Sequence, residues 1–135
     1  MAMNFEQYKK SILMQKIGDH KSHERLAKEI ESLYKVEDIK LFYAKNLFNN
    51  KEVEIYIFFE NGFAHCTLEE DRDVITHYHC KPLTKHFIIP NDNNHVRLNV
   101  SYDNGEQLSF DSLEDSGDNW YQEYIDHIRE LYKIL

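Results

Sequence analysis

The sequence contains few of the residues that interrupt or cross-link a chain, and it has no long apolar stretch. Its 135 residues include four glycines, two prolines and two cysteines. This composition excludes a collagen repeat, a low-complexity linker and a wholly disordered chain. The apolar run at 55–59 is far shorter than the roughly 18 residues of a membrane-spanning helix. A length of 135 residues favours a single domain over residues 1–135.

The two cysteines, Cys66 and Cys80, are too few for a disulfide framework. Residues 1–10 contain no apolar leader, which together with the free thiols indicates a reducing compartment. In such a compartment a thiol packs as a small apolar side chain. We therefore expect a cytoplasmic protein that does not span or bind a membrane.

The charge is acidic overall and unevenly distributed. Sixteen basic and twenty-four acidic side chains give a formal charge of −8. A charge of this sign repels phosphate groups, which excludes a general binder of nucleic acid or anionic lipid. Residues 91–135 hold ten acidic and three basic side chains, whereas residues 1–36 are slightly basic. A basic partner therefore suits the chain best.

Two amphipathic helices are predicted in the first third of the chain and a third helix at its end. Apolar residues recur at helical spacing over 5–13 and again over 26–34, with Ser22 as the N-cap of the second helix. Each of these helices has a narrow apolar stripe and must lie on another layer. The last helix, over 120–135 with Asp118 as its N-cap, has a wide apolar face that should fill the core.

Between the helices the apolar period changes to two residues, which indicates strands. Asn61-Gly62 and Asn104-Gly105 are typical of tight hairpin turns, and the other connections are short enough for neighbouring antiparallel strands. We therefore predict a seven-stranded antiparallel meander. The predicted strands are 39–45, 52–59, 63–69, 74–81, 83–89, 96–102 and 106–111.

Alternation along the strands assigns their side chains to two faces. The face predicted to form the core carries Val53, Ile55, Ile57, Phe59, Ala64, Cys66 and Leu68 together with Val96, Leu98, Val100, Tyr102, Leu108 and Phe110. The opposite face carries Tyr56, Phe58, Phe63, His65, Thr67, Ile75, His77, His79, His86 and Ile88. Because an exposed aromatic patch normally meets a partner, we expect the N-terminal helices to cover part of this second face.

Seven antiparallel strands followed by one amphipathic helix resemble the pleckstrin-homology-like domain, in which a barrel of two orthogonal sheets is closed at one corner by the last helix. The resemblance covers residues 38–135 and leaves residues 1–37 as a helical extension. It implies an α+β fold and a binding module in place of an enzyme. The loop at 46–51 offers only Lys51, with Lys45 nearby, so the basic loop of the lipid-binding members is missing. The chain also resembles small bacterial proteins of unknown function.

One group of side chains has metal-binding chemistry. His77 and His79 lie on the same side of one predicted strand, and pairing through the bend at 69–72 would place His65 opposite them, with His86 on the next strand. Three or four neutral imidazoles on one face could bind zinc or another transition metal, and the sequence suggests no other cofactor. The alternative is that these histidines are half-exposed and separate from one another. A change of one residue in the strand register would be enough to scatter them.

No catalytic motif accompanies these histidines. The sequence has no nucleophile elbow, no phosphate-binding glycine loop and no paired zinc cysteines, so we predict no enzyme activity and no catalytic residue. Two functions remain open. The first is a non-enzymatic module that binds a protein or peptide, with a basic one favoured, and the second is a protein that binds a metal or small ligand on the histidine face. Self-association through the outer face is a third alternative.

Overall fold

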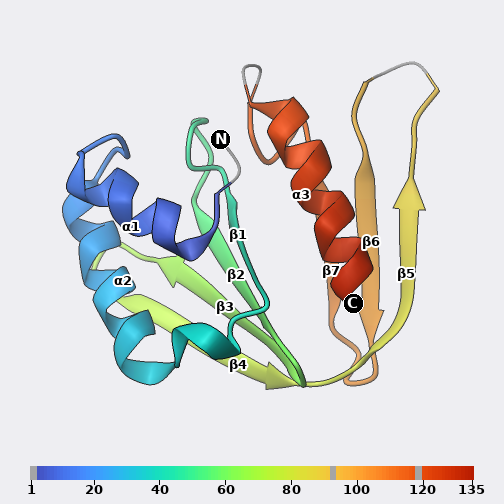
Figure 1. Cartoon of the computed structure of the whole chain (residues 1–135), viewed down its shortest axis with the longest axis horizontal. Helices are drawn as coiled ribbons and strands as arrows, with labels where there is room; N and C mark the ends of the chain where they lie inside the picture. Colours follow the sequence, from blue (N-terminus) through green and yellow to red (C-terminus); the bar gives the residue numbers. More distant parts are fainter. Residues whose placement is uncertain (1–2, 92–93, 118–119) are drawn as a thin grey trace.

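The computed structural model describes residues 3–91, 94–117 and 120–135. This part of the chain forms three α-helices, a short 3₁₀ helix and seven strands (Figure 1), which confirms the predicted α+β class and the order of the elements. Each strand lies within two residues of its predicted bounds. The elements are α1 (Phe5–Leu13), α2 (His20–Leu33), η1 (Val36–Asp38), β1 (Leu41–Lys45), β2 (Glu54–Phe59), β3 (Gly62–Leu68), β4 (Asp73–His79), β5 (Pro82–Ile88), β6 (Arg97–Tyr102), β7 (Gln107–Asp111) and α3 (Tyr121–Ile134). No helix in the described ranges combines the length and the apolar composition needed to cross a bilayer.

The structure tests the predicted N-cap of α2 and shows how α1 begins. A capping box begins α1, because the side chain of Asn4 accepts from the Gln7 amide and the Gln7 side chain accepts from the Asn4 amide. Helix α2 begins earlier than predicted, directly after Asp19 in the left-handed region (φ 55°). Ser22 as its N-cap is wrong, because the Ser22 amide already donates to the Asp19 carbonyl in the first turn. The predicted cap of α3, Asp118, lies outside the described residues.

The strands form two antiparallel sheets. The first has the order β1-β2-β3-β4 and the second the order β5-β6-β7. Within the described residues no ladder joins the two sheets, so the predicted closed barrel is not found. The two sheets lie on either side of α3 in Figure 1, while α1 and α2 cover the other side of the four-stranded sheet.

Helix α3 and the loop before it occupy the edge of β1 at which a closing strand would pair. Together they bond three backbone groups along this edge, which are therefore already satisfied. The three bonds run from the Asn46 amide to the Asp115 carbonyl (2.7 Å), from the Tyr124 hydroxyl to the Ala44 carbonyl (2.5 Å) and from His127 Nε2 to the Phe42 carbonyl (2.6 Å). The barrel thus stays open because two side chains of α3 and a backbone carbonyl of the loop before it occupy the edge where a ladder would form.

Two apolar cores lie on opposite faces of the four-stranded sheet. Between the sheets, Tyr56, Phe58 and Phe63 pack with the inner face of the second sheet and with α3. On the other face, Ile55 and Ala64 pack under α1 and α2. The predicted partition within β2 and β3 is confirmed, but the N-terminal helices cover the face opposite to the one predicted. The predicted inner residues of β6 and β7 are buried, as expected: Leu98, Val100, Tyr102, Leu108 and Phe110.

The buried histidines should make stability depend on pH. Burial lowers the pKa of His23 and of His127 below the ordinary value of 6.5, so both are neutral in the folded protein. The unfolded chain binds more protons below that pH, and stability therefore falls as the pH drops below about 6.5, by at most about 1.4 kcal/mol per pH unit for each histidine. Urea unfolding over a pH series measures this slope.

The substitution His127→Gln provides the matched control. Its amide can still donate to the Phe42 carbonyl, but it cannot take up a proton. We expect a shallower fall in unfolding free energy between about pH 6.5 and 5.5 than in the wild type. Identical slopes for the two proteins would contradict the assignment of the pH dependence to His127.

Candidate functional site

The four histidines predicted to converge lie in three separate places. His77 and His79 are neighbours on one face of β4, with ring centroids 4.6 Å apart. His65 lies on the opposite face of the same sheet, where its Nε2 is 3.0 Å from the Glu54 carboxylate. His86 is exposed on β5 in the other sheet. The predicted convergence is therefore wrong.

The turn between β3 and β4 separates His65 from the other two. The Glu69 amide donates to the Arg72 carbonyl, so two residues form the turn between a paired 69 and 72. Counting back from that pair places His65 opposite Thr76 and not opposite His77. Because successive residues of a strand point to opposite faces, this register puts His65 and His77 on different sides of the sheet.

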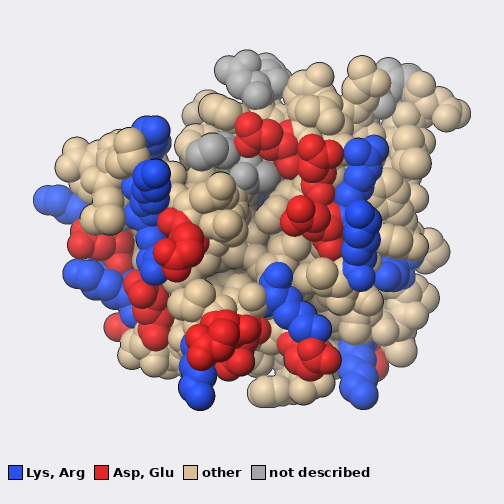
Figure 2. Space-filling model, viewed as in Figure 1, with Lys and Arg blue, Asp and Glu red and all other residues tan. Residues whose placement is uncertain are grey.

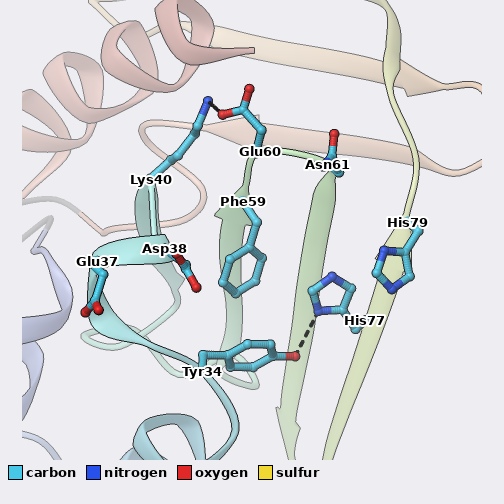
Figure 3. A pocket seen from close by; sticks show the side chains of 9 residues that line it. All are labelled: Tyr34, Glu37, Asp38, Lys40, Phe59, Glu60, Asn61, His77 and His79. Atoms are coloured by element: carbon cyan, nitrogen blue, oxygen red, sulfur yellow. Dashed lines mark hydrogen bonds and ion pairs between the residues drawn. The ribbon is translucent and has the colours of Figure 1, made fainter.

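His77 and His79 line a groove of about 430 Å³ on the helix-covered side of the sheet, past the end of α2. The end of α2, η1, the β2–β3 turn and β4 supply its walls (Figure 3). Helix α2 covers the beginning of β4, where Arg25 pairs with Asp73 at 2.7 Å. The end of β4 is left uncovered by the helix, and the groove lies there.

A row of rings forms one wall of the groove. The ring of Tyr34 lies 4.7 Å from that of Phe59, which stacks on His77 at 5.1 Å. Phe59 belongs to β2 and His77 to β4, so these rings meet across β3. They can do so because β3 presents only Gly62 and Ala64 beneath them. Sequence reasoning missed Tyr34 and Phe59, although small residues between two aromatic strands were a usable signal.

The rim of the groove is acidic. Lys40 forms an ion pair with Glu60, but neither Glu37 nor Asp38 takes part in any ion pair found among the described residues. In Figure 3 the Asp38 carboxylate points toward the Phe59 ring, whereas Glu37 points away from it. Figure 2 shows acidic side chains gathered where η1 lies in Figure 1. The groove thus has an uncompensated negative charge beside a ring face.

A hydrogen bond inside the groove joins two neutral side chains, Tyr34 and His77. Burial, and next the neighbouring His79, lower the pKa of His77, which keeps its imidazole neutral near neutral pH. Burial raises the pKa of the Tyr34 hydroxyl, which keeps its proton. The Tyr34 hydroxyl is hydrogen-bonded to Nδ1 of His77 over 3.0 Å. This bond holds both rings in place without adding a charge to the groove.

The arrangement offers a cation-binding surface. Among the residues that the structure describes, no group of three or more His, Cys, Asp or Glu side chains is placed to hold a metal ion. The predicted zinc site of His65, His77, His79 and His86 is therefore not formed. The Cys66 thiol is buried, and burial raises its pKa to about 12, so it supplies no thiolate. Ring faces beside a free carboxylate can instead hold an organic cation.

The acidic loop after β7 has a structural role. The Asp111 carboxylate accepts from the amides of Leu113 and Glu114 at 2.9 and 3.1 Å. The buried Asp115 carboxylate accepts from the Tyr43 hydroxyl at 2.8 Å. These carboxylates cap the turn and tie it to β1.

Comparison with known proteins agrees with the expectation of a family without an assigned activity. The match covers residues 4–126, which include every part of the chain that lines the groove. No curated protein and no solved structure matches the chain. The chain belongs to the family described as protein of unknown function (DUF3908).

Proposed function

We propose that the protein is a non-enzymatic binding module that takes an arginine side chain of a basic protein or peptide into the groove. The observation that carries the proposal is the row of Tyr34, Phe59 and His77 rings beside the Asp38 carboxylate. A planar guanidinium stacks on such rings and pairs with a carboxylate through two parallel hydrogen bonds. Lysine would gain less, because its compact ammonium group is strongly hydrated and cannot form the paired bonds.

The charge of the whole molecule supports the same partner. A formal charge of −8 attracts basic segments and repels acidic ones. Association should therefore become slower as salt is added. We also place the protein in the cytoplasm, a location that agrees with the free thiols of Cys66 and Cys80.

The fold supports binding in preference to chemistry. The structure has seven antiparallel strands in two sheets, followed by a helix. The proposal also draws on the resemblance of the sequence to the pleckstrin-homology-like domain. Such domains bind peptides, proteins or lipids, and the missing basic loop argues against lipid. The alternative of a metal or small ligand on a four-histidine face has lost its geometric basis, because only His77 and His79 lie together.

An NMR titration tests the proposal directly. The probe is a short capped peptide of alternating threonine and valine with one central arginine, compared with the same peptide carrying neutral citrulline. We expect the arginine peptide to shift the resonances of Tyr34, His77 and His79 at millimolar concentration, and the citrulline peptide to bind about tenfold more weakly. Equal shifts with the two peptides, or no shift with either, would overturn the proposal.

Two substitutions separate the groove from the general acidity of the chain. Asp38→Asn removes the carboxylate that faces the rings, and Glu123→Gln removes one charge from the exposed side of α3. We expect Asp38→Asn to lower the affinity for the arginine peptide about tenfold, and Glu123→Gln to lower it by less than about twofold. Equal losses would show that net charge alone attracts the peptide, which would also count against the groove.

A further inference from the structure

We propose that the partner's arginine arrives on an extended segment that pairs with the free edge of β4 and becomes a fifth strand of the four-stranded sheet. The inference rests on the proposed function and states how the partner binds. Addition of a strand to a sheet edge is a recurrent mode of peptide recognition, in which the backbone supplies affinity and alternate side chains supply selectivity.

The hydrogen-bond pattern shows which backbone groups of β4 are free. The Cys80 amide donates to the Asn61 carbonyl, and the Glu69 amide donates to the Arg72 carbonyl. Both pairs follow the register of the β3–β4 ladder, in which bonded and non-bonded pairs alternate. Thr76 and Tyr78 therefore bond to β3, while the amides and carbonyls at 75, 77 and 79 point away from it. Outside the ladder, no hydrogen bond among the described residues reaches these backbone groups.

The same residues face the groove with their side chains. His77 and His79 lie opposite Ala64 and Gly62, on the helix-covered side of the sheet. A partner residue that pairs with His77 in an antiparallel ladder places its side chain on that side as well. An arginine at this position would extend beside the imidazole of His77 toward the ring of Phe59. The free backbone groups and the cation-binding surface thus belong to one site.

The other strand edges lack this combination. The edge of β1 is bonded to α3 and the loop before it. On β7, the Ser109 carbonyl accepts from the ammonium group of Lys45. The edge of β5 begins with Pro82, which has no amide hydrogen, and its register shifts directly after this residue. Proline and local irregularity are the usual ways in which proteins protect an edge.

β4 has none of these protections. Its sequence from 74 to 79 contains no proline, lysine or acidic residue, and its ladder with β3 runs without a register shift. Its one charged residue, Asp73, is paired with Arg25. An unprotected edge whose side chains line the groove, in a chain with a formal charge of −8, fits an extended segment that is basic. A segment of this kind is the occupant that we infer.

Backbone methylation of the arginine peptide tests the mode of binding apart from the side chain. Methylating the arginine amide, or the amide two residues away, removes donors that face β4. We expect at least about a tenfold loss of affinity from each, and less than about a twofold loss when the intervening amides are methylated. In the wild-type complex the amides of Ile75, His77 and His79 should gain protection from hydrogen exchange, while those of Thr76 and Tyr78 should be protected already.

The outcomes distinguish this inference from the proposed function. If the peptide binds in an arginine-dependent way but tolerates methylation at every position, strand addition is wrong and the groove proposal stands. If binding does not depend on arginine, the proposed function fails, and this inference fails with it. If the amides at 75, 77 and 79 become protected in the free protein as its concentration rises, β4 pairs with a second copy of the chain, which also overturns the inference.

Discussion

Replacing Phe110 with alanine should lower the free energy of unfolding by about 3–5 kcal/mol, because the residue is fully buried where the two sheets meet. Its ring lies 4.8 Å from that of Tyr43 and 5.3 Å from that of Tyr56, both edge-on, and 5.9 Å from that of Phe58. These rings come from the four-stranded sheet, whereas Phe110 comes from the three-stranded one. The alanine variant would leave a cavity that neither sheet can close alone. Urea unfolding followed by circular dichroism measures the loss.

Phe42→Ala is the matched substitution on the other side of the four-stranded sheet. Phe42 is also buried and packs on Phe5 and Tyr8 of α1, in the helix-covered core. If the chain unfolds as one domain, as its length predicts, both variants shift a single transition that all probes report together. A second transition in Phe42→Ala alone would show that α1 and α2 unfold separately, as an extension. A loss below about 1 kcal/mol in Phe110→Ala would contradict the packing of the two sheets.

The elements of the fold could be predicted because their signals are local. A period of two along residues 97–102 indicates a strand, and so does the short apolar run at 55–59, whichever layer packs on it. The helical spacing over 5–13 indicates an amphipathic helix in the same way. The cap of α2 could not be predicted in the same way. Ser22 has the right chemistry, but the backbone of Asp19 turns into the helix earlier.

The layer that covers each sheet face could not be predicted from alternation. Alternation separates Ile55 and Ile57 from Tyr56 and Phe58, but both sets are apolar. Which set meets the helices depends on the direction in which the chain enters β1 and leaves β4, and this is set by contacts distant in the sequence. The structure places α1 and α2 on the Ile57 side, so the aromatic side is free to pack with Phe110 and α3.

The candidate site was predicted only in part for a similar reason. His77 and His79 could be identified, since two residues apart on one strand they must share a face. Whether His65 lies on the same face depends on whether the turn at 69–72 contains two residues or three. The amino-acid composition of the turn does not reveal this difference. Tyr34 and Asp38 join the site only because α2 ends there and η1 turns the chain back over β2.

Gly62→Ala should be the most damaging of the glycine substitutions, with a loss of more than about 3 kcal/mol in unfolding free energy. Gly62 has a φ of +147°, a conformation that a residue with a side chain rarely adopts. A Cβ atom added there would lie 1.9 Å from the carbonyl oxygen of Tyr78 on β4. Both the backbone strain and the clash have to be relieved by moving β4 away from β3. Urea unfolding measures the loss, with two other glycines as controls.

The two control glycines separate the effect of backbone strain from that of the steric clash. Gly105 also has a positive φ, +89°, but no atom lies within 4 Å of an added Cβ, so Gly105→Ala should cost only about 1 kcal/mol. Gly18 has neither constraint, and Gly18→Ala should be neutral or slightly stabilising. Equal losses at 62 and 105 would show that the clash with Tyr78 is not formed. Because Gly62 also leaves the space over β3 in which Phe59 meets His77, folded Gly62→Ala protein should bind the arginine peptide more weakly, whereas folded Gly105→Ala protein should bind it as the wild type does.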